Sequence, residues 1–278
     1  MKGDGSMNND ELKVHAKNIR CNIIKMLEKA GSGHPGGSLS ITDILTYLYF
    51  EVMDINKTNI DSYERDRFVL SKGHAAPGLY STLCEKGLIS EEELMTYRQL
   101  GSRLQGHPKM HTGDGVDMST GSLGQGISAA VGMALANKID GNSHRVFVMI
   151  GDGESEEGQV WEASMAANRY HLDNLTVILD FNHLQIDGTV EEVIDPTPFV
   201  EKFKAFKYNT IECDGHDFDS IHEAFTSAFN YHDGPTAIVA HTIKGKGVSF
   251  MENQIAWHGK APNAQQRDEA LKELEESK

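Results

Sequence analysis

Cysteines and long apolar runs are both scarce in this sequence of 278 residues. Its three cysteines, Cys21, Cys84 and Cys213, stand far apart, and no Cys-x-x-Cys pair occurs. Such a set argues against a disulfide framework or a structural zinc site and indicates reduced thiols in a cytoplasmic protein. No run of about 18 apolar residues occurs, so we expect no transmembrane helix and no membrane partner. The polar first ten residues also lack the apolar stretch of a secretory signal.

Positive charge is also in short supply. The chain has 26 Lys and Arg against 41 Asp and Glu, which gives a formal net charge of −15. Binding to a nucleic-acid backbone depends on clustered Lys and Arg, so we expect no nucleic-acid partner. A small phosphate-bearing ligand needs only one local set of donors, and the net charge does not exclude it.

The first half of the chain is predicted to contain helices separated by glycine-rich turns. Apolar residues repeat at helical spacing over residues 12–30, and Gly31 is a suitable C-terminal cap. Residues 31–38 are too rich in glycine for a helix. The other elements expected here are a helix over 41–53, a strand over 67–70, a helix beginning at the Ser90-x-x-Glu93 capping box, and a small-residue helix after the 121–126 turn.

From residue 145 onward, strands and helices alternate. Apolar runs predict buried strands over 146–150, 175–179 and 236–240, with a further strand over 208–212. Helices are expected over 161–170 and 198–207, after a Ser220-x-x-Glu223 cap, and after Pro262. This alternation predicts an α/β fold with a mostly parallel central sheet flanked by helices. We expect residues 1–10 to be a disordered or expression-derived leader and residues 11–278 to form a single domain.

The most informative segment is 146–153, in which an apolar strand ends in Gly-Asp-Gly. This places Asp152 at the carboxyl edge of the sheet, where ligands bind in open α/β sheets. A carboxylate repels phosphate, but a divalent cation between them resolves the conflict, because magnesium is commonly held by one or two side chains plus phosphate oxygens. Asn182 follows the next strand, 182 − 152 = 30 positions later, and the backbone carbonyl of Leu184 offers a third oxygen.

Taken singly, Gly-Asp-Gly is a common surface turn and Asn182 is a loop residue. Their placement at two strand ends, one strand-helix-strand unit apart, favours a metal and diphosphate site. A dinucleotide site is set aside because Gly121-Ser-Leu-Gly-Gln-Gly126 does not have the Gly-x-Gly-x-x-Gly spacing and follows no convincing apolar strand. No Gly-x-x-x-x-Gly-Lys-Ser/Thr loop occurs.

Gly-Asp-Gly followed about 30 residues later by Asn resembles the signature of thiamine-diphosphate enzymes. Five further segments are similar to transketolase motifs, in that family's order: Ser32-Gly-His-Pro-Gly36, Leu70-Ser-Lys-Gly-His-Ala75, Gln105-Gly-His-Pro108, Thr120-Gly-Ser-Leu-Gly-Gln-Gly126 and Trp257-His-Gly259. The likeness extends from about residue 12 to residue 265. It implies the thiamine-diphosphate-binding fold, in the domain type that holds the diphosphate. It also implies transfer of a two-carbon ketol unit from a ketose phosphate to an aldose phosphate.

The resemblance further implies which residues hold the cofactor. Asp152, Asn182 and the Leu184 carbonyl would bind Mg²⁺ or Ca²⁺. The diphosphate would contact His74, Gly153 and His258. The rings of thiamine diphosphate would lie against Gly121, Leu123 and Ile186.

The resemblance places four histidines around the reacting carbon: His34, His74, His107 and His258. Imidazoles suit this role because they exchange protons and donate hydrogen bonds near neutral pH. A lone Gly-His-Pro is more often an ordinary turn, and most of the 13 histidines are expected at the surface. Glu157 matches an acid that in the family joins a network between paired active sites; otherwise it would be an exposed acid at a helix start.

Two departures from the family's pattern affect the expected assembly. Ser122 stands where transketolases usually carry proline, which loosens the turn but leaves its backbone amides available. The chain also stops near residue 278, without the domains that in the family bind the aminopyrimidine ring and the sugar phosphate. We therefore expect the partner to be a separate C-terminal subunit, with the cofactor held between subunits of an α2β2 assembly. We expect no activity from this chain alone.

Three alternatives stay open. The first is the α subunit of a 2-oxo-acid dehydrogenase, although the histidine set and the Gly-His-Pro at 106–108 favour ketose chemistry. The second is a non-catalytic regulator that binds thiamine diphosphate, which the intact metal and histidine motifs argue against. The third is a fragment of a broken gene, whose exposed partner face would make it poorly soluble. The sequence does not distinguish pentose phosphates from branched or sulfonated sugars.

Overall fold

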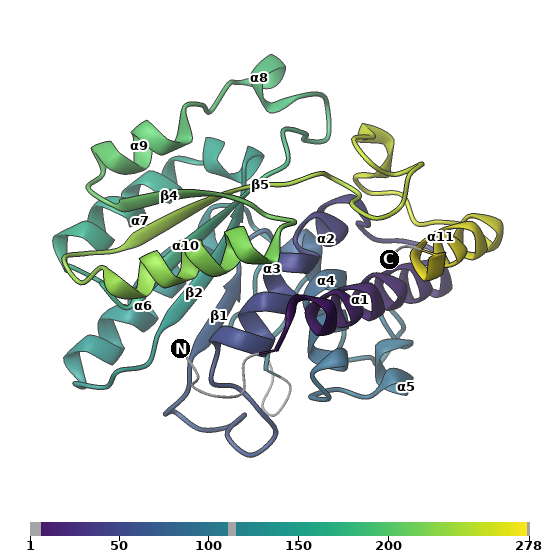
Figure 1. Cartoon of the computed structure of the whole chain (residues 1–278), viewed down its shortest axis with the longest axis horizontal. Coiled ribbons are helices and arrows are strands. Elements are labelled where there is room, and N and C mark those ends of the chain that lie inside the picture. The colour runs from purple at the N-terminus through teal and green to yellow at the C-terminus, as the bar shows by residue number, and fades with distance from the viewer. Residues whose placement is uncertain (1–6, 111–114, 277–278) are drawn as a thin grey trace.

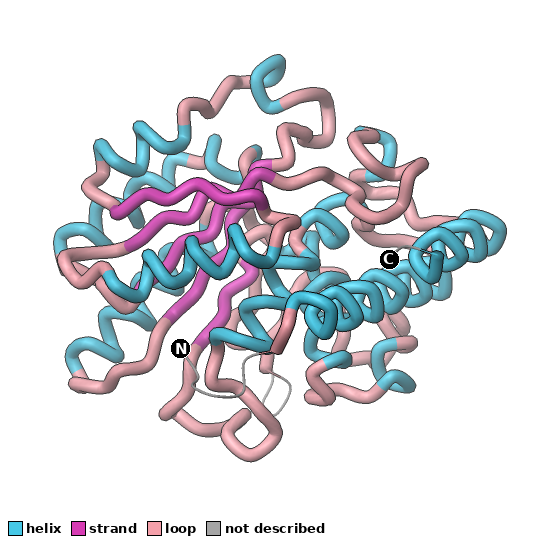
Figure 2. Tube along the Cα trace, in the orientation of Figure 1, coloured by secondary structure: helices cyan, strands magenta, loops and turns pink. Residues whose placement is uncertain are grey.

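Five parallel strands form one central sheet in the order β1-β2-β3-β5-β4 (Figures 1 and 2). In this computed structural model the described residues are 7–110 and 115–276. The strands are β1 (Arg67–Leu70), β2 (Val146–Gly151), β3 (Leu175–Phe181), β4 (Asn209–Asp214) and β5 (Thr236–His241). The predicted parallel α/β fold is confirmed, and all five expected strands are present to within two residues at each end.

Successive side chains of a strand point to opposite sides of the sheet, so the sheet has two apolar faces. A different set of helices covers each face. In β2, Phe147 and Met149 join one apolar core, whereas Val146, Val148 and Ile150 join the other. The first core is closed by α1 (Asn9–Ala30), α3 (Thr42–Tyr47), α4 (Ala76–Glu85) and α10 (Phe218–Asn230), and the second by α6 (Gln125–Ile139), α7 (Gly158–Arg169) and α9 (Phe199–Ala205). Every residue of β2 is buried, as the apolar run predicts.

The remaining helical segments are short or lie beside this framework. They are α2 (Gly36–Ser40), α5 (Glu91–Leu94), α8 (Val190–Val193), α11 (Ala264–Glu276), a π-helix (Leu48–Val52) and 3-10 turns at Gly73–Ala75, Gly153–Glu156 and Ile255–Trp257. Helix α11 runs alongside α1, where Arg267 pairs with Glu28 at 2.9 Å (Figure 1). Across the described residues, no helix is both long enough and apolar enough to cross a membrane.

The limits of α1 follow from its two caps. Asn8 accepts hydrogen bonds from the backbone of Asp10 and Glu11, and the Glu11 carboxylate bonds back to the Asn8 amide, which completes a capping box. The helix therefore begins two residues before the expected domain start at residue 11. Residues 1–6 of the expected leader lie outside the described residues. At the other end, Gly31 is the predicted C-terminal cap, with φ of 63°.

Gly31→Ala is expected to lower the free energy of unfolding by about 1 kcal/mol, because a Cβ disfavours the left-handed conformation even where space is free. Gly132, in the exposed middle of α6, is the matched control, since a Cβ there also meets nothing within 4 Å. Gly132→Ala is expected to raise stability by roughly 0.5–1 kcal/mol. Urea unfolding of both variants measures the two changes in the free energy of unfolding. A change of the same sign in the two variants would contradict the explanation.

One prediction about residues 31–53 is wrong. The glycine-rich turn is expected to be non-helical, yet α2 begins at Gly36. The helix predicted over 41–53 is present, as α3 continued directly by the π-helix. At Gly36 the packing is tight. A Cβ on Gly36 would lie 2.9 Å from the Lys244 side chain and 3.0 Å from the Trp257 carbonyl. Glycine is tolerated in this helix because its neighbours leave no room for a larger residue.

The predicted cap at Ser220 is also wrong. Helix α10 begins at Phe218, and Asp217 is its N-cap, accepting from the Asp219 amide at 3.0 Å. The Ser220 hydroxyl instead accepts a hydrogen bond from the backbone amide of Asp214 at 3.1 Å. By contrast, Ser90 does cap α5, as expected, by accepting from the Glu93 amide.

Candidate functional site

Polar residues follow two neighbouring strands where these end at the carboxyl edge of the sheet. Strands β2 and β3 pair in register, with Gly151 opposite Asp180. The backbone amide of Asp152 donates to the Asp180 carbonyl at 3.2 Å. One carboxylate oxygen of Asp152 accepts from the amide of His183 at 2.7 Å. The two predicted strand ends are therefore adjacent and on the same rim of the sheet.

The three predicted metal ligands all belong to this rim. Asp152 is 3% exposed, and Asn182 is 4% exposed. The Asn182 side-chain oxygen lies 3.2 Å from the Leu184 amide, while its nitrogen donates to Asp180 at 2.9 Å, so the orientation of the amide is fixed. Across the described residues, no group of three or more His, Cys, Asp or Glu side chains could hold a metal ion. One carboxylate, one amide and one carbonyl form a hard oxygen set whose remaining ligands must come from elsewhere, which fits a cation shared with a diphosphate.

Asp180 lies fully buried beneath this rim and was not predicted to have a role. Its carboxylate accepts hydrogen bonds from Ser40 at 2.8 Å and from Thr242, and it pairs with the buried ammonium of Lys72. Lys72 and these donors outweigh burial and hold the pKa of Asp180 below its ordinary value. Burial and the nearby charge of Asp180 raise the pKa of Asp152 to about 6. A positive ion at the rim would restore the ionised form of Asp152.

Lys244 is a second residue that was not predicted. Its Nζ donates to the Leu184 carbonyl at 2.9 Å and lies 2.9 Å from Nδ1 of His258. Burial and the charge of Lys72 lower the pKa of Lys244 to about 8. The lysine follows the end of β5, so the strand-end signal that identified Asp152 could have identified it as well. Two buried ammonium groups at this edge fit an anionic ligand such as a diphosphate.

The four predicted histidines come together beside this rim. The ring of His34 lies 5.4 Å from that of His74, 6.2 Å from that of His107 and 5.5 Å from that of His258, between ring centroids. Four separate segments supply these rings: the turn before α2, the 3-10 turn after β1, the loop after α5 and the residue after the Ile255–Trp257 turn. The cluster is therefore a product of the tertiary fold, as the resemblance implied.

The environment of the cluster favours uncharged imidazoles. Burial, followed by the charge of Arg98, lowers the pKa of His34 to about 4. Burial and Lys244 lower the pKa of His258 to about 3, and burial and Lys72 bring the pKa of His74 well below its ordinary value. Nδ1 of His34 is buried without a hydrogen-bond partner within the part of the chain that the structure describes. Neutral rings can accept or donate a proton to a bound hydroxyl or carbonyl group.

The glycine-rich motifs allow these segments to approach one another closely. A Cβ on Gly73 would lie 2.8 Å from the Gly121 amide, and a Cβ on Gly121 would lie 3.2 Å from the ring of His107. The backbone at Gly121 therefore lies against His107, with Leu123 half-buried two residues on. Ser122, where the family usually has proline, is exposed.

Three predicted cofactor-binding residues are more exposed to solvent than Asp152 and Asn182. Ile186 is 62% exposed, Gly153 is half-buried, and Glu157 is exposed at the N-cap of α7. Glu157 packs against Gly124, whose Cβ would lie 2.7 Å from that of Glu157. The roles of these three residues stay predictions.

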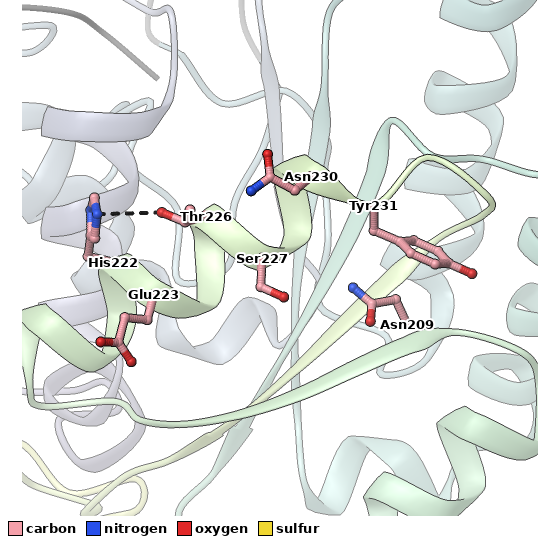
Figure 3. A pocket seen from close by; sticks show the side chains of 7 residues that line it. All are labelled: Asn209, His222, Glu223, Thr226, Ser227, Asn230 and Tyr231. Carbon is pink, nitrogen blue, oxygen red and sulfur yellow. Dashed lines mark hydrogen bonds between the residues drawn. The ribbon is translucent and has the colours of Figure 1, made fainter.

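A polar groove of about 750 Å³ lies elsewhere, between α10 and the start of β4 (Figure 3). It is lined by Asn209, His222, Glu223, Thr226, Ser227, Asn230 and Tyr231. Because Asn209 begins β4, this end of the groove faces the amino edge of the sheet, opposite the rim that carries Asp152. The groove shares no residue with the histidine cluster, and we assign it no part of the chemistry.

Comparison with known proteins gives the class and the family of a domain with this fold and site. Residues 12–275 match the family described as "Transketolase, thiamine diphosphate binding domain". The chain belongs to this family, which confirms the resemblance inferred from its motifs.

The chain matches relatives of about its own length, and it also matches part of the longer chains of solved structures. The chain is 41% identical to one subunit of the apulose-4-phosphate transketolase of Phocaeicola vulgatus, covering 96% of this chain and 95% of the relative. It is 44% identical to "6-deoxy-6-sulfo-D-fructose transketolase subunit SqwG" of Clostridium sp. (strain MSTE9), covering 95% and 96%. It superposes on transketolase from Campylobacter jejuni with a TM-score of 0.91 and 33% identity, covering 97% of this chain but 43% of that one.

Proposed function

We propose that this chain is the thiamine-diphosphate- and metal-binding subunit of a two-chain transketolase. The observation that carries the proposal is that three candidate oxygen ligands, two buried lysines and four imidazoles lie together at one rim of the sheet. Two relatives matched over nearly their whole length are named as transketolase subunits, which supports the same reading.

The residues of the rim would hold the cofactor by its diphosphate. Asp152, Asn182 and the Leu184 carbonyl would bind Mg²⁺ or Ca²⁺. The donors His74, Gly153, Lys244 and His258 would bind the diphosphate oxygens. Gly121, Leu123 and Ile186 would lie against the rings, and Glu157 would face the second active site. When bound, thiamine diphosphate supplies the nucleophilic carbon and the electron sink for breaking and forming the carbon–carbon bond.

The four histidines would bind the reacting end of the sugar and exchange protons with it. His34, His74, His107 and His258 would donate to or accept from the hydroxyl and carbonyl groups nearest the bond that changes. Their low pKa values suit this role, since neutral rings at pH 7 can take a proton and return it. The substrates would be a ketose and an aldose with an anionic group, phosphate or sulfonate, because the matched relatives act on sugars of both kinds by name.

The partner would be a C-terminal transketolase chain that completes the site. The chain spans 42% of human transketolase and a similar share of the solved transketolases, and the partner would supply the remainder. We further propose an α2β2 assembly.

The test uses this chain, a C-terminal transketolase chain from the same genome, and the two together. With thiamine diphosphate and Mg²⁺, ketol transfer between sugar phosphates is expected only from the pair. Ketol transfer by this chain alone would contradict the proposal that the active site needs both chains. Cofactor binding by the pair without any transfer would favour a regulator, and decarboxylation of a 2-oxo acid would favour the dehydrogenase alternative.

A further inference from the structure

Arg98 is a cation without a carboxylate partner beside the histidine cluster. The net charge of the chain is −15, and Arg20, Arg65, Arg67, Arg103 and Arg267 all pair with carboxylates. Within residues 7–110 and 115–276, no carboxylate lies at ion-pair distance from Arg98, Arg145 or Arg169. Of these three, Arg98 is the one whose charge bears on the histidine cluster.

The position of Arg98 is held by its backbone and by Tyr97. Its φ is 59°, in the left-handed region that non-glycine residues seldom adopt, and its amide donates to the Leu104 carbonyl at 2.9 Å. The guanidinium donates from Nε to the Tyr97 hydroxyl at 3.0 Å, and its central carbon lies 5.5 Å from the Tyr97 ring centroid. Such a backbone conformation persists only where surrounding contacts fix it.

Tyr97 and Arg98 together support the turns that carry two of the four histidines. A Cβ on Gly106, which precedes His107, would lie 2.7 to 2.8 Å from three guanidinium atoms of Arg98. The Tyr97 hydroxyl donates to the Gly106 carbonyl at 3.3 Å. A Cβ on Gly33, which precedes His34, would lie 3.2 Å from that hydroxyl. The turn of His107 therefore rests on Arg98 and Tyr97, and the turn of His34 rests on Tyr97, which Arg98 contacts.

We propose that Arg98 is a positioning residue of the histidine cluster, which fixes the turn of His107 directly, bears on the turn of His34 through Tyr97, and places a permanent positive charge beside both rings. It acts through the histidines. A permanent charge at this point opposes protonation of the rings without itself titrating, because arginine stays protonated in proteins.

The electrostatics agree with this geometry. Five groups bear on His34: Arg98, His74, His107, His258 and Lys244. Among them Arg98 has the largest effect on the pKa of His34, after burial. His107 faces the ring of His34, and burial followed by Arg98 lowers the pKa of His107. Removal of the Arg98 charge should raise both pKa values, so that more of each imidazole is protonated at mildly acidic pH.

The experiment compares Arg98→Met with Arg98→Lys, which keeps the charge but not the planar donor. Histidine titrations by NMR are measured in the assembly with the partner chain, and the His34 and His107 signals are identified from His34→Gln and His107→Gln. Arg98→Met is expected to move both midpoints to higher pH, to move the acidic limb of kcat/KM the same way, and to lower kcat/KM at neutral pH roughly ten- to a hundredfold. Arg98→Lys is expected to keep the midpoints while recovering only part of the rate.

Arg103→Met is the matched control, since it removes an ion pair with Glu93 in the same loop without changing the charge beside the rings. Its histidine midpoints should stay at the wild-type values. Unchanged midpoints in Arg98→Met, or equal shifts in Arg103→Met, would overturn the proposal. The inference rests on the proposed function only for the rate measurements, because the titrations report on Arg98 even if the assembly transfers no ketol unit.

Discussion

Asp152→Ala is expected to abolish the thermal stabilisation that thiamine diphosphate and Mg²⁺ give to the two-chain assembly. The substitution removes the only carboxylate among the three proposed metal ligands. Loss of a residue that merely orients a ligand already costs about 10- to 100-fold in metal affinity, so loss of the ligand itself should cost at least about a hundredfold. The measurement is the melting temperature with and without cofactor, combined with calorimetric titration of Mg²⁺ in the presence of thiamine diphosphate.

The matched control for Asp152 is Asp214. This aspartate also ends a strand at the carboxyl edge of the sheet, but it is exposed, on edge strand β4, and its carboxylate accepts a local hydrogen bond from the His216 amide. Asp214→Ala should keep the cofactor-dependent rise in melting temperature. If Asp152→Ala kept it too, Asp152 would not be a metal ligand.

Lys72→Met is expected to lower the free energy of unfolding of the cofactor-free chain by about 3–5 kcal/mol. The Lys72 side chain is 2% exposed, and that of its partner Asp180 is fully buried. Removal of the ammonium leaves a buried carboxylate without a counter-charge, which is far more costly than loss of a surface pair. Urea unfolding followed by circular dichroism measures the change.

Two further variants test the cause of that loss. Lys138 pairs with Asp173 at 2.7 Å on the surface, where the two side chains are 40% and 30% exposed. Lys138→Met should cost less than about 1 kcal/mol. The double variant Lys72→Met with Asp180→Leu should recover part of the stability, since it removes both buried charges. Recovery should stay incomplete because Ser40, Thr242 and Asn182 lose their acceptor. Equal losses in Lys72→Met and Lys138→Met would show that burial does not decide the effect.

The sheet and the placement of the candidate ligands could be predicted because their signals are local. An uninterrupted apolar run such as 146–150 fits a strand covered on both faces, and the residue after it must lie at the strand end. Two such runs in a parallel sheet bring their ends to the same rim, which predicts the shared rim of Asp152 and Asn182. That β2 and β3 are also neighbours is not fixed by sequence order, since β3 pairs with β5 and not with β4. The meeting of the four histidines depended instead on the family resemblance, since nothing local links residues 34, 74, 107 and 258.

What could not be predicted depends on contacts between distant segments. At the start of α2, Lys244 and Trp257, more than 200 positions away, leave no room for a side chain at Gly36. The ion pair of Lys72 and Asp180 spans 108 positions, and a lysine inside Ser-Lys-Gly-His gives no sign of burial. At α10, Asp217 and Ser220 are both good N-caps, and the choice depends on the bond between Ser220 and the Asp214 amide. Arg98 was overlooked because its role requires knowledge of what lies against Gly106.

The scattered origin of the histidine cluster bears on how the protein is made. His34 and His258 are 258 − 34 = 224 positions apart, and His258 is reached only after all five strands have been synthesised. Contacts of such long sequence separation form late, because bringing the two segments together costs the conformational entropy of the chain between them. The complete set of rings therefore forms only after the segment that carries His258 has been synthesised and has packed against the sheet, so affinity for a ligand that needs all four rings would distinguish folded molecules from partly folded ones.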